Sequence, residues 1–197
     1  MTTSSPATAP DLTAVARMAG VAGLASAAIV LLNSAKRSML LPTTDALQLL
    51  APVAEVLALG LLIGLYAAVA PRVGRAGLAA FAVDFAAVAL LVGAEFAINL
   101  VFPRLPGAEV TALLDGPLGG ALTTASILFV IGGWAVAAVL LRSGTGGAWA
   151  PLTYAVGSTL VGLRAFVPEW ALNSGLVILA AGIAGLSLWL LTHRRAR

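Results

Sequence analysis

The sequence predicts an all-α protein, a polytopic bundle of six transmembrane helices. Only 19 of the 197 residues are charged, 11 Lys or Arg and 8 Asp or Glu. That share is 10%, whereas soluble domains carry roughly 25%. The mean hydropathy is +1.04. The apolar residues also gather in runs of about 20, which is the length of helix that crosses a bilayer core.

The same composition excludes several other classes of protein. So few charges cannot cover the surface of a soluble globule. The chain has no cysteine and a single histidine, His193, which rules out thiolate chemistry and histidine-based metal sites inside the bundle. We therefore expect no cofactor and no bound metal. The net charge is +3, but the bases occur singly, not on the clustered face that nucleic acid requires, so we expect no nucleic-acid partner.

Three apolar runs in the first half of the chain predict three membrane spans. The first run stops at the polar cluster 33–37, and the second follows the turn 42–45. The third ends just before Pro103, since proline cannot continue a helix that precedes it. The predicted spans are 14–33, 46–70 and 76–101.

Three further runs in the second half predict the remaining spans. A connector over 104–117 contains proline and glycine turn signals and separates them from the first three. The glycine-rich turn 143–147 divides the fourth span from the fifth, and Pro168 ends the fifth, which is the shortest. The predicted spans are 118–141, 149–167 and 171–191.

This layout divides the chain into a flexible tail of residues 1–12, a transmembrane domain of 13–192 and a basic tail of 193–197. With six spans, both termini lie on one side of the membrane, and that side carries seven bases against four on the other. The positive-inside rule then puts both termini in the cytoplasm. We expect the membrane to be a bacterial inner (plasma) membrane. The two sets are Arg17, Arg72, Arg75, Arg142, Arg194, Arg195 and Arg197 inside, and Lys36, Arg37, Arg104 and Arg164 outside.

Three acids, Glu55, Asp84 and Glu95, lie inside predicted spans. A carboxylate at the bilayer centre costs about 3 kcal/mol, so such a residue indicates function unless a base neutralises it. At about 1.5 Å per residue, Glu95, Glu55 and Asp84 lie roughly 9, 14 and 18 Å below the outer face. Asp84 and Glu95 are about three helical turns apart and share a face with Asn99. We interpret the acids as candidate proton donors or a proton relay.

A polar cavity open to the outside is predicted around Glu55 and Glu95. Pro52 removes one helix hydrogen bond and leaves the Gln48 carbonyl free, and irregular backbone at membrane depth is typical of a cavity wall. Alternatively, Pro52 marks a helix start, with residues 44–51 lying along the interface. The candidate binding residues are Gln48, Asn99, Arg164, Lys36 and Arg37, together with the aromatic Trp134 and Tyr154, which could face a cationic intermediate.

Structural explanations compete with each of these functional ones. The bases Lys36, Arg37 and Arg164 lie at outer helix ends, from which they can extend to the headgroups or turn toward an acid. An ion pair between Glu95 and Arg164 could serve only to order the helices. The hydroxyls of five further residues are expected to bond to carbonyls of their own helices. These residues are Thr123, Thr124, Ser126, Ser158 and Thr159.

Three short segments give the chain a likeness to a known group. They are 17–20 (RMAG) at the start of the first span, 141–144 (LRSG) after the fourth and 188–191 (LWLL) at the end of the sixth. In these segments and in its layout the chain resembles an uncharacterised group of bacterial six-helix membrane proteins, a domain-of-unknown-function family. The resemblance covers nearly the whole chain and implies the six-span fold, but it implies no activity and no site residue.

Three classes of function remain open. The first is a carrier or permeation subunit that handles a small molecule or protons in the outward polar cavity. The second is an intramembrane enzyme in which Glu55 or Asp84 protonates an isoprenoid or other lipid-like substrate, as a cyclase or isomerase requires. The third is a structural accessory subunit, in which the acids order the bundle or meet a partner. The expected partners are the lipid bilayer, a lipid-like or small-molecule ligand, and a second copy or partner subunit.

Overall fold

A computed structural model describes residues 12–145 and 147–193 of the chain, and every regular element in this part is helical. The prediction of an all-α fold is therefore confirmed. The predicted tails lie outside the described residues, except for Leu12, which begins the first helix, and His193, which ends the last. The helices are α1 (Leu12–Arg37), α2 (Asp45–Phe96), the π-helix η1 (Ala97–Val101), the 3-10 turn η2 (Phe102–Arg104), α3 (Gly107–Leu114), α4 (Pro117–Arg142), α5 (Trp149–Gly162) and α6 (Glu169–His193).

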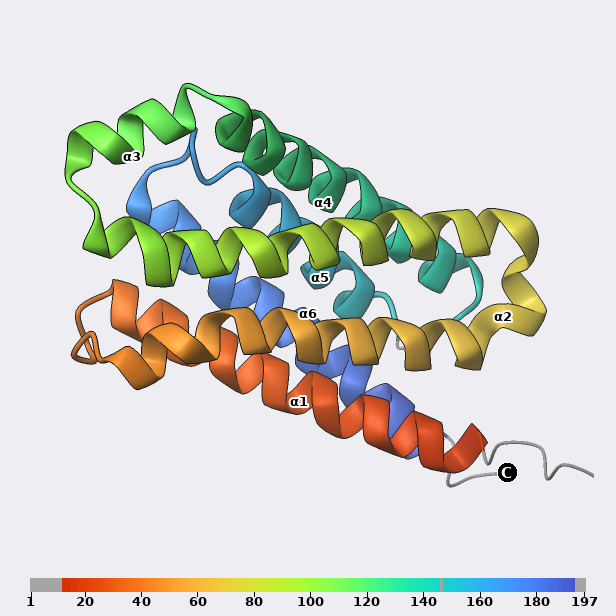
Figure 1. Ribbon diagram of the computed structural model, residues 1–197. Coiled ribbons are helices and arrows are strands. Elements are labelled where there is room, and N and C mark those ends of the chain that lie inside the picture. The colour runs from red at the N-terminus through yellow and green to blue at the C-terminus, as the bar shows by residue number, and fades with distance from the viewer. Residues whose placement is uncertain (1–11, 146, 194–197) are drawn as a thin grey trace, which may run out of the picture.

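Helix α2 contains the second predicted span and most of the third, whose last five residues form η1, because the chain reverses direction at Gly74 without a loop. Figure 1 shows the two antiparallel legs meeting at this point. Gly74 has φ +56° and ψ −156°, a conformation that is essentially restricted to glycine. We call residues 45–73 the first leg and 75–96 the second leg. The predicted boundary at 71–75 thus falls at the reversal.

Pro52 does not break or start a helix. Helix α2 begins seven residues earlier, at Asp45, where the Thr44 side chain caps it by accepting a hydrogen bond from the Leu47 N–H at 3.3 Å. Gly74 is the residue with non-helical backbone angles inside α2. Pro52 is a buried interior residue, so the alternative that it marks a helix start is wrong. Packing around the proline ring holds the backbone helical despite the lost hydrogen bond.

The fifth predicted span is shorter in the structure than in the sequence analysis. Helix α5 has 14 residues, or about 21 Å, and it ends at Gly162 instead of reaching 167. The next residue, Leu163, has φ −86° and ψ +17°, and turns occupy the chain from there to Pro168. The predicted length assumed that an apolar run stays helical to its end.

Four helical stretches of the described chain are long and apolar enough to cross a membrane, namely 13–37, 45–104, 117–142 and 169–192. Their outward faces carry large apolar side chains. Ile63, Leu90 and Leu188 are each about half exposed, and an exposed apolar surface of this extent is typical of a face that meets lipid or a partner. The structure therefore has the helices of a membrane protein.

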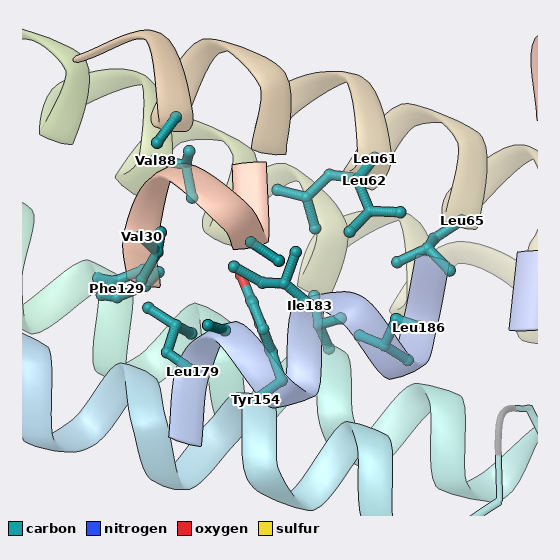
Figure 2. Packing of buried hydrophobic residues seen from close by; sticks show 14 of the residues in the cluster. Val30, Leu61, Leu62, Leu65, Val88, Phe129, Tyr154, Leu179, Ile183 and Leu186 are labelled. Carbon is teal, nitrogen blue, oxygen red and sulfur yellow. The ribbon is translucent and has the colours of Figure 1, made fainter. Parts of the chain in front are cut away.

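The helices close into a ring in which α6 contacts both α1 and α5, the first leg of α2 contacts α1, and α4 packs between α2 and α5. Figure 2 shows the interior, where Leu61 and Leu65 of α2 face Ile183 and Leu186 of α6. Small residues bring the helices together, as at Gly64 of α2, which lies against Ala19 of α1. Close packing of this kind drives helix association in membranes, where lipid is as apolar as the side chains.

The bundle has two distinct ends. One end holds α3, the α1–α2 connection, the α5–α6 connection and the start of α4, and we call it the α3 end (Figure 1). The opposite end holds the Gly74 reversal and the α4–α5 turn, and the described chain starts and finishes there (Figure 1). The polar side chains described next lie at the α3 end and at mid-bundle.

Candidate functional site

A connected set of polar side chains joins four segments at the α3 end. Lys36 Nζ at the end of α1 donates to Asn99 Oδ1 at 2.9 Å, and Asn99 Nδ2 donates to Glu95 Oε2 at 2.8 Å. Arg164 Nη1, from the α5–α6 connection, donates to Glu95 Oε1 at 3.2 Å. We call Lys36, Glu95, Asn99 and Arg164 the Glu95 network. It ties α1, the second leg of α2, η1 and the α5–α6 connection together.

Asn99, in the π-helix η1, contacts Glu95 twice. Asn99 Nδ2 also donates to the Glu95 main-chain carbonyl at 3.0 Å. A π-turn widens the helix and frees backbone carbonyls, a distortion that is frequent at functional sites. Here the Asn99 amide nitrogen donates to the Glu95 main-chain carbonyl while its amide oxygen accepts from Lys36. The shared face of Glu95 and Asn99 was predicted, whereas the π-turn was not.

Arg37 does not join the Glu95 network. Its Nε and Nη2 atoms donate to the two carboxylate oxygens of Glu169, at 3.0 and 3.1 Å, at the start of α6. Both side chains are well exposed, so this pair contributes little to stability. A cavity of about 30 Å³ lies between the pair and the Glu95 network, with Asn33 and Leu176 in its wall. It has the volume of about one water molecule.

At mid-bundle, Asp84 and Tyr154 form a buried pair. Asp84 is fully buried on the second leg of α2, and Tyr154 is 5% exposed on α5. The Tyr154 hydroxyl donates to Asp84 Oδ2 at 2.7 Å. The other carboxyl oxygen, Oδ1, is buried and has no hydrogen-bond partner in the described chain. Phe129 of α4 meets the Tyr154 ring edge-on with ring centroids 6.5 Å apart and fixes its orientation.

Two successive glycines of α4 make this pair possible. A Cβ atom at Gly132 would lie 2.6 Å from Asp84 Cα and 2.8 Å from Asp84 Oδ1, which is closer than atoms pack. A Cβ atom at Gly133 would overlap the Ser158 side chain of α5. The glycine pair therefore lets α4 approach both the acid and the helix that carries its tyrosine. Asp84 and Tyr154 were each predicted as candidate site residues, but their pairing was not predicted.

Glu55 lies between these two groups without bonding to either. It is partly exposed on the first leg of α2 and makes no hydrogen bond or ion pair with a described residue. It lies within electrostatic range of Glu95, Asp84 and Arg164. Gln48, on the same leg, lines neither the small cavity nor the larger groove described below. The structure thus brings together Glu95, Asn99, Arg164 and Lys36, and it leaves Gln48 apart.

The remaining predicted side chains have mainly local roles. Trp134 is 46% exposed, and its indole N–H donates to Thr159 Oγ1 at 2.9 Å, linking α4 to α5. Four of the five hydroxyls bond to carbonyls of their own helices as predicted, those of Thr123, Thr124, Ser158 and Thr159. The fifth, the hydroxyl of Ser126, has no hydrogen-bond partner among the described residues.

A groove at the α3 end was not predicted from the sequence. This groove has a volume of about 920 Å³. It runs along the N-terminal half of α4 and is bounded by η1, η2 and the α5–α6 connection. We call it the α4 groove. Its wall includes Arg164 of the Glu95 network and the successive glycines Gly119 and Gly120 of α4.

Comparisons of the chain with models of protein families, with curated proteins and with solved structures find no match.

Proposed function

We propose that the chain is a multi-pass membrane protein that exchanges a proton at Asp84 and handles a small molecule at the α3 end, as a carrier or permeation subunit. The observation that carries this proposal is the unpartnered Oδ1 of Asp84. An acid that served packing alone is expected to have both oxygens bonded, since buried polar atoms almost always have partners. A carboxyl held by Tyr154 through one oxygen can accept or release a proton on the other.

The arrangement of the other acids supports a relay toward Asp84. Glu55 is in electrostatic range of both Glu95 and Asp84, so the three acids form a series from the α3 end to the middle of the bundle. The titratable groups that face Asp84 are Tyr154 from α5 and Glu55 from the first leg of α2, while α4 faces it with Gly132. A proton on Asp84 therefore has Glu55 as its acidic neighbour on the side of the Glu95 network.

We place the α3 end outside a bacterial inner membrane and both termini in the cytoplasm, with α5 as a short fifth pass of six. The charge distribution supports this orientation. Arg72 and Arg75 flank the Gly74 reversal, and Arg142 ends α4 at the same end of the bundle. Together with Arg17 and the C-terminal arginines they form the larger set of bases, which is expected to stay in the cytoplasm.

Two other classes of function are less well supported. An acid-catalysed enzyme acting on a lipid-like substrate needs its acid in contact with that substrate, but neither Glu55 nor Asp84 is in the wall of the α4 groove. An accessory subunit accounts for the pair of Glu95 with Arg164, which joins α2 to the α5–α6 connection. It does not account for the unpartnered oxygen of Asp84.

The test is proton flux in proteoliposomes that contain a pH-sensitive dye, driven by a potassium diffusion potential. Asp84→Asn should abolish flux, because an amide cannot carry the proton. Glu109→Gln is the matched control, since Glu109 is an exposed acid of α3 away from the buried acids and its variant should conduct like the wild type. Wild-type flux equal to that of empty liposomes, or undiminished flux in Asp84→Asn, would overturn the proposal.

A further inference from the structure

The α4 groove has the size and the wall of a ligand site. Its volume of about 920 Å³ falls within the range of roughly 300–1,000 Å³ found for sites that bind small molecules. Most of the wall is apolar, with Ile98, Leu122 and Val130 among its side chains. Beside a bilayer, such a wall suits a molecule with a hydrocarbon chain.

The groove also contains hydrogen-bonding groups that the protein itself leaves unused. Arg164 gives one nitrogen, Nη1, to Glu95, and its Nε and Nη2 atoms have no partner among the described residues. The Ser126 hydroxyl, also in the wall, is likewise without a partner in the part of the chain that the structure describes. The planar guanidinium with two free donors matches the geometry of a carboxylate or phosphate.

The other charged groups in the wall do not compete for this role. Arg37 is held by both carboxylate oxygens of Glu169, so these two side chains neutralise each other. Asp115 is exposed at the end of α3 and is expected to stay solvated. Arg164, whose side chain is 26% exposed, is therefore the cation in the groove with donors to spare.

We propose that the α4 groove binds a single-chain amphiphile with an oxyanion head, a carboxylate or a phosphate, at Arg164 and Ser126, and with its chain along the N-terminal half of α4. The volume favours one chain over the two chains of a phospholipid. This inference rests on the proposed function in that it names the class of small molecule handled at the α3 end. It also gives a link to the acids, because Arg164 donates to Glu95 through Nη1 and would hold the oxyanion through its other nitrogens.

The test measures binding and not flux, so its failure is distinguishable from the failure of the proton proposal. The protein in neutral-detergent micelles is titrated with palmitate, hexadecyl phosphate and the neutral alcohol hexadecanol, and bound ligand is counted by native mass spectrometry. The wild type should bind at least one of the two oxyanions about tenfold or more tighter than the alcohol, which cannot form a charge-assisted hydrogen bond with Arg164.

Two variants and one control distinguish binding of the ligand's head group from binding of its hydrocarbon chain. Arg164→Gln should remove the preference for oxyanions over the alcohol. Gly120→Leu should weaken all three ligands by about tenfold or more, because Gly120 lines the groove and a Cβ atom there meets nothing within 4 Å. The side chain thus fills the groove without a clash. Gly93→Leu is the control, since Gly93 is equally open, exposed and outside the groove.

Three outcomes would overturn the inference. One is hexadecanol binding as tightly as the oxyanions, which would make the groove a general apolar gap that lipid fills. Another is binding by Gly120→Leu that equals that of Gly93→Leu, which would place the ligand elsewhere. The third is tighter binding of a two-chain phosphatidylglycerol than of either single-chain oxyanion. Gly120→Leu adds a helix-favouring residue at an open position and should fold. The comparison of Gly120→Leu with Gly93→Leu therefore tests the groove even where Arg164→Gln fails to fold.

Discussion

Tyr154 donates its hydroxyl hydrogen bond to Asp84 across the interface between α5 and the second leg of α2, over a distance of 2.7 Å. The two residues are 70 positions apart in the chain. The bond attaches α5, which has only 14 residues, to α2 at the middle of the bundle. It also leaves the second oxygen of Asp84 as the one that can change its proton.

Replacing Tyr154 by phenylalanine should lower the free energy of unfolding by about 1–3 kcal/mol, because Asp84 loses its donor while staying buried. Tyr66→Phe is the matched control. Tyr66 packs against Phe81 with ring centroids 5.5 Å apart, and its hydroxyl has no hydrogen-bond partner among the described residues. Unfolding by SDS in mixed micelles measures both variants, and equal losses would contradict the role assigned to the Tyr154 bond.

The pair of Glu95 with Arg164 should show a coupling of about 1 kcal/mol in a double-mutant cycle, because it is half-buried and part of a network. The cycle uses Glu95→Gln, Arg164→Gln and the double variant. The Arg37–Glu169 pair supplies an internal comparison: it is more exposed and should show a smaller coupling. If folding is restored by the reversed pair Glu95→Arg with Arg164→Glu while proton flux is also normal, Glu95 is a structural residue and not a relay residue.

Gly74→Ala should destabilise the protein by about 1–3 kcal/mol, because alanine at φ +56° and ψ −156° occupies a backbone conformation that only glycine adopts readily. Nothing lies within 4 Å of a Cβ atom at this position, so the cost is one of conformation and not of space. The same substitution at Gly93, inside a regular helix, should stabilise by up to about 1 kcal/mol. In thermal unfolding, the two variants should change the stability in opposite directions. A change in the same direction would contradict the special backbone conformation assigned to Gly74.

The orientation of the bundle can be tested directly, since the chain has no native cysteine. Thr111→Cys lies on α3 and Ala148→Cys at the start of α5, both at exposed positions and at opposite ends of the bundle. A membrane-impermeant maleimide should label Thr111→Cys in intact spheroplasts and label Ala148→Cys only after lysis. The reverse pattern would place the termini outside.

The parts of the fold that depend on composition and local pattern were predictable from the sequence. Long apolar runs gave the helices, and proline and glycine gave most of their ends. Pro52 lies inside a helix, as the first interpretation had it; the alternative of a helix start stayed open because a proline lacks an N–H in either place, and packing decides whether the helix continues. The end of α5 at Gly162 was missed since apolar residues continue beyond it.

The sequence predicts which residues belong to the candidate site better than it predicts which of them contact each other. The spacing of Glu95 and Asn99 on one helix fixes their shared face, and the structure has them bonded. Which base meets Glu95 depends on how helices rotate about their axes, so Arg164 stayed one of several partners. The bond of Tyr154 to Asp84 needs α4 to come close through Gly132 and Gly133, and no single-helix pattern reports that approach.

The reversal at Gly74 has a consequence for how the protein is made. The two legs of α2 are joined by a turn and not by a loop. Neither leg could therefore insert into a bilayer before the other. In the topology proposed above, the two legs insert as one helical hairpin, and the arginines beside the reversal, Arg72 and Arg75, set its orientation. In that topology, the short segment 72–75 sets the orientation of α2, which has 52 of the 197 residues.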